Sequence, residues 1–239
     1  MDNLIEIKNL DAWYSKNKPV LRNLSLNIDE NSITGLLGLN GAGKTTLINT
    51  LCGLHSGMKL DSFKFAGNEM NFRNNEFKKS RYVVFSEDNS LEYFTFDEYL
   101  KYVEKTYGKR TDNAEVDRLS KAFNFGSYRS MLMKNLSLGN RRKAYLITAF
   151  ALKPELLLLD EPVNGLDFQS TEALYAEISS YRKYGSILFS SHVLESVTLT
   201  CDKVCILENG DISQMFTGQE ITPENIRSVL KFEGDDKNV

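Results

Sequence analysis

Residues 38–46 carry the pattern that most restricts what this chain can fold into. The string Gly-Leu-Asn-Gly-Ala-Gly-Lys-Thr-Thr fits the phosphate-holding loop G-x-x-x-x-G-K-[ST]. The apolar run Ile33–Leu37 precedes it as a predicted buried strand, and residues 46–52 follow as a predicted helix that ends at Gly53. A ligand-free glycine turn would not need Lys-Thr after its last glycine, so this segment predicts a nucleoside-triphosphate site in an α/β fold.

The parts of this loop have separate predicted roles. Its glycines let successive amides turn toward phosphate oxygens, and the helix N-terminus adds partial positive charge there. We expect Lys44 to reach the β- and γ-phosphates and the Thr45 hydroxyl to bind Mg²⁺. The predicted nucleotide-binding residues of the loop are Gly38, Leu39, Asn40, Gly41, Ala42, Gly43, Lys44, Thr45 and Thr46.

A second segment supplies carboxylates to the same site. The apolar run Leu156–Leu159 is typical of a strand buried on both faces of a parallel sheet, and it ends in Asp160 and Glu161. In open α/β sheets, ligands bind at the carboxyl ends of the strands. We expect Asp160 to hold Mg²⁺ and Glu161 to polarise the water that attacks the γ-phosphate. Taken alone, Glu161 could be a solvated strand end, but the phosphate loop favours the functional role.

Further short motifs follow in the order of a known family. They are Leu136–Asn140 with the basic string after it, Asn164–Asp167, Ser190–His192 after an apolar strand, and Tyr14 near the start. No single string is specific, but their order and spacing together are. Through them the chain resembles the ATP-binding subunit of ABC transporters over nearly all of its length.

The resemblance implies roles for these motifs. Ser137, Gly139 and Asn140 belong to the family's signature, which contacts the γ-phosphate bound by another subunit. Asp167 belongs to a loop that links the two nucleotide sites, and His192 contacts the γ-phosphate. The signature would use the hydroxyl of Ser137 and the close backbone approach of Gly139.

The resemblance assigns adenine stacking to Tyr14. The neighbouring Trp13 is the alternative, because an indole ring can stack in the same way. The spacing from Leu10 favours Tyr14.

The chain departs from the family pattern at several positions. Glu87 stands where Gln is usual before the helical subdomain, Leu138 where Gly is common, and Asn140 where Gln is usual. The Glu87 carboxylate can still ligate Mg²⁺ through oxygen. We expect its extra negative charge to strengthen metal binding and to change the placement of water.

The pattern of apolar residues predicts an α/β fold around these motifs. Residues 5–8 and 24–28 alternate like half-exposed antiparallel strands and predict a small β-layer beside adenine. Apolar strands alternate with helical patterns in the second half of the chain, which is typical of a parallel sheet. Strands are expected near 156–159, 186–190 and 203–208, helices near 168–184 and 192–199, and a hairpin turn at Asn209-Gly210.

The middle of the chain is mostly helical. A helix is predicted to open at Thr95 with a capping box, another to span residues 112–125, and a third residues 139–152. The expected organisation is a single ABC domain over residues 1–239: a P-loop NTPase core with a mixed parallel sheet, a small antiparallel β-layer and an inserted helical subdomain. The core would comprise 1–90 and 154–239, and the helical subdomain about 91–153.

The composition limits where the protein works. No stretch approaches the ~20 apolar residues that span a bilayer, and the acidic start is unlike an export signal. The formal net charge of −3 argues against broad nucleic-acid binding, so no nucleic-acid partner is expected. The three cysteines do not form a disulfide framework. We expect a cytoplasmic protein, held at the inner face of the cell membrane by a membrane partner.

The resemblance implies an ATPase that powers a membrane transporter with ATP and Mg²⁺. Two ATP molecules would lie between two subunits, the second being another copy or a related chain, and an integral-membrane subunit would receive the motion. The string Ser86–Asp88 and the motifs around Asp167 and His192 favour an exporter, whereas residues 221–226 resemble the tails of iron-chelate and cobalamin importers. A soluble mechanical ATPase acting on DNA or ribosomes is the alternative, although no long coiled-coil insert is visible. A non-hydrolysing module is disfavoured by Glu161 and His192.

Overall fold

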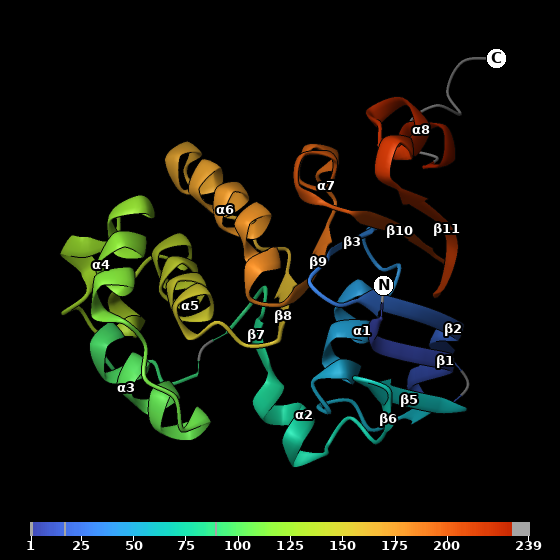
Figure 1. Ribbon diagram of the computed structural model, residues 1–239, viewed down its shortest axis with the longest axis horizontal. Helices are drawn as coiled ribbons and strands as arrows, with labels where there is room; N and C mark the ends of the chain where they lie inside the picture. The colour runs from blue at the N-terminus through green and yellow to red at the C-terminus, as the bar shows by residue number, and fades with distance from the viewer. Residues whose placement is uncertain (1, 17, 89, 231–239) are drawn as a thin grey trace.

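The computed structural model describes residues 2–16, 18–88 and 90–230, which form two β-sheets with helices around them (Figure 1). The larger sheet has six strands and the smaller has five. In their order across the larger sheet, the strands are β11 (Asp211–Thr217), β10 (Lys203–Glu208), β3 (Ile33–Leu37), β9 (Ser186–Ser191), β8 (Leu156–Asp160) and β7 (Arg81–Val84).

The larger sheet is mixed, as predicted. Its neighbouring strands are parallel except for β11, which pairs antiparallel with β10 after the turn at Asn209-Gly210. Every residue of β3, β8 and β9 is buried, because helices cover one face of the sheet, and α1 (Lys44–Leu51) and the smaller sheet cover the other. The continuous apolar runs in the sequence are therefore the central strands.

Alternate residues of β8 enter two separate cores. Leu157 and Leu159 pack with residues of α5 (Leu138–Leu152) and α6 (Phe168–Ser180). Leu156 and Leu158 pack on the opposite face with α1 and the smaller sheet. Because β3, β9 and β8 run parallel, the start of α1, which follows β3, and the end of β8 lie at the carboxyl ends of the strands.

The smaller sheet is antiparallel and confirms the predicted β-layer. Its longest strands pair with several register shifts and extend well beyond the predicted segments 5–8 and 24–28. Residues 58–80, for which the sequence patterns predicted no elements, add three short strands and a helix. These elements are β1 (Asn3–Ser15), β2 (Lys18–Asp29), β4 (Met58–Lys59), β5 (Ser62–Phe65), β6 (Asn68–Glu69) and α2 (Asn75–Ser80).

The predicted helical insertion is present and gathers at the left end of Figure 1. α3 (Phe96–Tyr107) opens with the expected capping box, in which Thr95 and Glu98 bond each other's backbone amides. α4 (Asn113–Ala122) begins after Asp112, which caps it, and α5 is the third predicted helix. The helices thus form where local capping signals and apolar periodicity agree.

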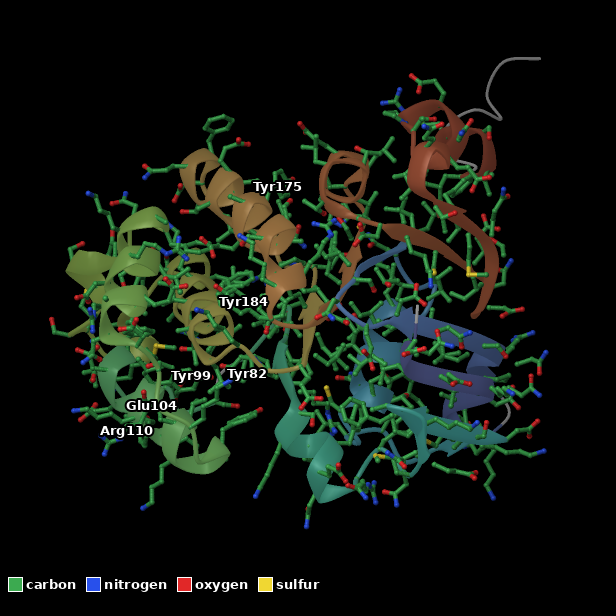
Figure 2. All side chains as sticks on the ribbon, viewed as in Figure 1. Tyr82, Tyr99, Glu104, Arg110, Tyr175 and Tyr184 are labelled. Carbon is green, nitrogen blue, oxygen red and sulfur yellow. The ribbon has the colours of Figure 1, made fainter. Side chains whose placement is uncertain are left out.

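A pair of buried tyrosines joins these helices to the edge of the larger sheet. The hydroxyl of Tyr82 on β7 lies 2.5 Å from that of Tyr99 on α3, and Figure 2 shows the two side by side. Burial raises the pKa of both phenols, so both stay protonated at neutral pH. The Tyr107 hydroxyl donates to the Arg81 carbonyl at 2.7 Å and strengthens the same joint.

The remaining helices are short. In the part of the chain that the structure describes, no helix is long and apolar enough to cross a membrane. Residues 231–239, at the C-terminal end of the chain, lie outside the described residues. The other helices are α7 (Leu194–Thr200), α8 (Pro223–Val229) and the short 3₁₀ segments η1 (Gly126–Tyr128), η2 (Met133–Asn135), η3 (Tyr181–Lys183) and η4 (Gly218–Glu220).

Candidate nucleotide-binding site

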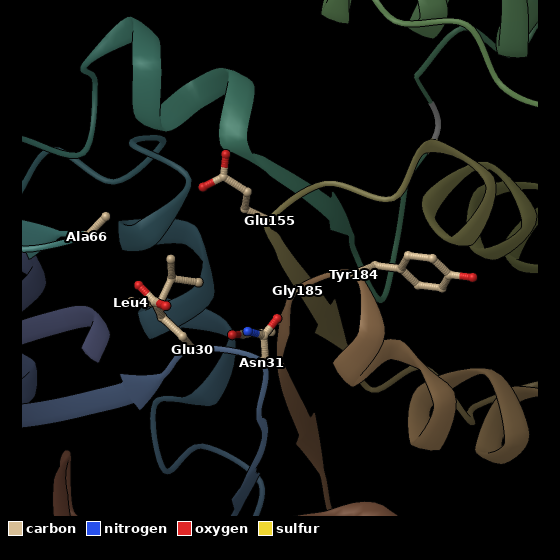
Figure 3. A pocket seen from close by; sticks show the side chains of 8 residues that line it. Leu4, Glu30, Asn31, Ala66, Glu155, Tyr184 and Gly185 are labelled. Carbon is tan, nitrogen blue, oxygen red and sulfur yellow. The ribbon is translucent and has the colours of Figure 1, made fainter. Parts of the chain in front are cut away.

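Two pockets lie at opposite ends of the strands of the larger sheet. One, of about 170 Å³, lies beside Asn31, Glu155 and Gly185, each of which precedes a strand (Figure 3). The other, of about 380 Å³, lies at the carboxyl ends and is lined by Tyr14 and the loop before α1. Ligands of open α/β sheets bind at the carboxyl ends of the strands, so the pocket lined by Tyr14 and the loop before α1 is the candidate site.

The loop between β3 and α1 has the conformation that its glycines permit. Gly43, the residue before α1, has a φ of +113°, and a Cβ there would come within 2.7 Å of the Leu21 side chain. This turn lets α1 begin at Lys44 rather than at the predicted Thr46. The loop amides therefore meet the N-terminus of α1, where an anion is favoured.

The Lys44 side chain lies folded over this loop. Its ammonium donates to the carbonyl oxygen of Gly38 at 2.7 Å and lies 3.4 Å from Glu161 Oε1. Only 6% of the Lys44 side chain is exposed. A buried cation at the mouth of an amide-lined loop is suited to bind phosphate oxygens.

The Asp160 carboxylate, at the end of β8, is surrounded by hydroxyl groups. Its fully buried carboxylate accepts hydrogen bonds from Thr45 Oγ1 at 3.0 Å, Ser86 Oγ at 3.0 Å and Ser190 Oγ at 2.7 Å. These groups offer oxygen donors only, and Mg²⁺ prefers oxygen ligands. The donor set fits the predicted magnesium site at Thr45 and Asp160.

Ser86 is a site residue that the sequence analysis missed. The metal-side contact was assigned to Glu87, but the side chain that touches Asp160 is that of Ser86. Successive residues of an extended segment point to opposite sides, so the alternation after β7 was the available signal. The Glu87 carboxylate lies close enough to Arg142 for its charge to oppose the lowering of the Arg142 pKa by burial. The role of Glu87 as a metal ligand stays a prediction.

The Glu161 side chain contacts other residues than Asp160 does, and its role in hydrolysis stays a prediction. Its φ is +49°, unusual for a residue with a side chain, and its amide donates to Ser190 Oγ at 2.9 Å. Its carboxylate lies between the Lys44 ammonium and His192, whose Nδ1 is 2.7 Å from Glu161 Oε2. The structure thus brings together Lys44, Glu161 and His192, three residues predicted separately from distant motifs.

Tyr14 lies at the open side of the pocket. It is 69% exposed, and its hydroxyl is 3.4 Å from Thr46 Oγ1. The His55 ring, for which no role was predicted, packs edge-on against Tyr14 with 4.8 Å between ring centroids. His55 Nε2 is also 3.0 Å from the carbonyl oxygen of Trp13. An exposed, braced ring at this place favours Tyr14 over Trp13 as the surface on which adenine stacks.

The signature residues occupy another part of the surface. Ser137 caps α5 by accepting from the Asn140 amide at 3.2 Å. A Cβ on Gly139 would come within 2.2 Å of the carbonyl oxygen of Gly165, so these two backbones touch. Among the described residues, those lining the pocket around the phosphate loop do not include Ser137, Gly139 or Asn140.

Asp167 is held within its own chain. It caps α6 by accepting from the Ser170 amide at 2.9 Å, and its carboxylate lies 2.5 Å from the Lys143 ammonium. These hydrogen bonds lower the pKa of Asp167 to about 2. The carboxylate is therefore charged at neutral pH and ties the start of α6 to α5.

Comparisons with known proteins agree with this geometry. Residues 21–164 match the family model described as ABC transporter. The ABC-type transporter ATP-binding protein EcsA of Bacillus subtilis (strain 168) is 33% identical over 226 residues, which cover 91% of this chain and 89% of EcsA. A solved ATP-binding subunit of an ABC transporter superimposes with a TM-score of 0.79 at 28% identity and covers 90% of each chain. A dimeric ATP-binding cassette bound to ADP and Pi shares the fold, with a TM-score of 0.77 at 17% identity, over 89% of this chain and 98% of that one.

Proposed function

Because this chain belongs to the ABC transporter family, as an ATP-binding and ATP-hydrolysing subunit that powers transport, we propose that it works in pairs that hold ATP between them. The second subunit is another copy or a related chain. The observation that carries this proposal is the position of Glu161 between Lys44 and His192, beside the Thr45–Asp160 contact. This cluster is half of a hydrolytic site, because it binds the triphosphate from one side only.

The chemistry of this half follows from the contacts. The loop amides and Lys44 bind the phosphate oxygens, and the Tyr14 ring supports the adenine. Thr45 and Asp160, with Glu87, would hold Mg²⁺, which neutralises charge on the phosphates when bound. The Glu161 carboxylate orients the attacking water, and His192 contacts the γ-phosphate from the next strand.

The other half comes from the partner's signature. Ser137 and Gly139 lie outside the pocket of their own chain. Leu138 lies between them and is 58% exposed, and Phe168, three residues after the Gly165 that touches Gly139, is 83% exposed. Apolar side chains this exposed next to a functional motif support a covering partner. ATP then favours the closed pair, and loss of the γ-phosphate favours its opening.

Ser137→Asp tests this arrangement directly. Asp caps helices as well as Ser does, so α5 keeps its start, but the new carboxylate would face the partner's triphosphate. We expect ATP hydrolysis to fall by roughly 100-fold because like charges repel at close range. Steady-state ATPase assays and size-exclusion chromatography with MgATP measure the loss of turnover and of the pair.

Ser137→Asn is the matched control, since it caps the helix without adding charge. It should keep most of the turnover, and both variants should bind ATP as the unmodified protein does. Full activity in Ser137→Asp would show that this residue does not meet a bound triphosphate, and the paired arrangement would then be wrong.

The transporter partner follows from family membership, and its contact surface is our inference. We place the protein at the inner face of the cell membrane, with the exposed Tyr93 and the partly buried Phe94 beside α3 facing an integral-membrane subunit. Phe96, the next aromatic residue along the chain, is fully buried and belongs to the core. The motif strings around Ser86, Asp167 and His192 favour export as the direction.

Purification from membrane extracts checks the membrane partner. We expect the protein to co-purify with an integral-membrane chain and to lose it when Tyr93 is changed to Glu. Retention on ribosomes or DNA instead would favour the soluble mechanical ATPase.

A further inference from the structure

Arg142, on α5, is a buried cation that donates to backbone carbonyl groups of the described residues. It is 4% exposed, and its guanidinium donates to the carbonyl oxygens of Glu161, at 3.0 Å, Asn164 and Ser86. A guanidinium in the interior is costly unless its donors are used, so these bonds hold it and the loops together.

The three acceptors come from the segments that follow two neighbouring strands, β7 and β8. Glu161 and Asn164 lie after β8 in the core, whereas Ser86 lies after β7 on the way to α3. Arg142 itself is on α5, the signature helix, which begins at the signature residues Ser137 to Asn140. One side chain therefore joins the signature helix to both segments that end at the hydrolytic site.

Two of the bonded residues are also the ones whose side chains shape that site. Ser86 donates its hydroxyl to Asp160, and the Glu161 carboxylate meets Lys44 and His192. The positive φ of Glu161 is a conformation that the surroundings must support. Arg142 supplies such support by fixing the carbonyl group of the same residue.

The charge of Arg142 also faces the carboxylates of the site. Burial lowers its pKa, while the nearby Asp160, Glu161 and Glu87 oppose that shift. An arginine stays protonated in proteins, so the cation remains in place. It does not line the pocket around the phosphate loop, so it acts through its neighbours.

We propose that Arg142 is a positioning residue for ATP hydrolysis, which fixes the backbones of Glu161 and Ser86 relative to the signature helix. The inference rests on the proposed function, because it concerns the same site. ATP binding uses the loop before α1 and needs no contact with Arg142. Turnover needs Glu161 within a fraction of an ångström of its working position, so it depends on Arg142.

The test compares Arg142→Gln with Arg142→Lys by steady-state kinetics and calorimetric ATP binding. We expect kcat to fall at least ~10-fold in Arg142→Gln, since small misplacements at a reacting group cost this much, with KM and the Kd for ATP within about twofold. Arg142→Lys should lie between, because an ammonium keeps the charge but cannot span carbonyls on both loops.

Arg81→Gln is the matched control. Arg81 is 5% exposed and also donates to backbone carbonyls, those of Cys52 and Phe72, but it lies at the opposite end of β7. Its replacement should lower the melting temperature and leave kcat unchanged well below that temperature. A lower melting temperature with unchanged kcat is the result expected for an arginine whose role is only structural.

The outcomes separate the inference from the proposed function. Unchanged kcat in both Arg142 variants, or a rise in KM equal to the fall in kcat, overturns the role of Arg142. If Arg142→Gln does not fold, Arg142→Lys decides by the same criteria. Absence of hydrolysis in the unmodified protein would instead refute the proposed function.

Discussion

Glu161→Gln should lower the turnover number for ATP about a thousandfold while ATP still binds, since proton transfer by a positioned carboxylate contributes this much. The amide keeps the size of the side chain between Lys44 and His192 but loses the charge that orients water. ATP that binds but is not hydrolysed should hold the paired subunits closed. Single-turnover hydrolysis and light scattering in MgATP measure both effects.

Glu155→Gln is the control for this variant. Glu155 precedes the same strand at the opposite edge of the sheet, so its loss should not change kcat. Normal hydrolysis in Glu161→Gln would assign the water to another group. A protein that stays monomeric in saturating MgATP would contradict the paired arrangement.

Lys44→Ala should raise the Kd for ATP by about 100-fold, because charge-assisted hydrogen bonds to phosphate contribute ~1.5–3 kcal/mol each. The variant also leaves the Glu161 carboxylate without its nearby cation, which adds repulsion toward the triphosphate. Isothermal calorimetry with ATP and AMP measures the effect, and the difference in affinity between the two nucleotides should shrink.

Lys203→Ala gives the comparison for the loss of a lysine. Lys203 pairs with Asp29 at 2.6 Å on another part of the sheet, so ATP affinity should not change. An unchanged Kd in Lys44→Ala would mean that the phosphates lie elsewhere than on the loop before α1.

Much of the fold could be predicted because its signals are local. The apolar runs of β3, β8 and β9 are typical of central strands, and a glycine loop followed by Lys-Thr is typical of a strand-to-helix connection. The capping box at Thr95 likewise fixed the start of α3. The short strands within residues 58–80 carry no such run, and pairing with β1 determines β4 and β5. Asn74 caps α2, but its six residues are too few to show an apolar period.

The parts of the site that escaped prediction depend on contacts between distant segments. Ser86 rather than Glu87 meets Asp160 because of the direction in which the segment after β7 leaves the sheet. Arg142 lies in the basic string Arg141–Lys143, which is typical of a solvated helix start. Its side chain is nevertheless buried among carbonyl groups of other loops. Side-chain direction at the ends of elements is set by tertiary packing, which composition and spacing do not encode.

The contact between Gly139 and Gly165 has a mechanical consequence. Side chains usually absorb small displacements by changing rotamer, but here backbone rests on backbone and nothing compliant separates them. If the segment after β8 shifts when ATP is hydrolysed, the start of α5 must therefore move by a similar amount. Alanine in place of Gly139 would force the two backbones apart, and it would therefore weaken the coupling between hydrolysis and transport even in a chain that still folds.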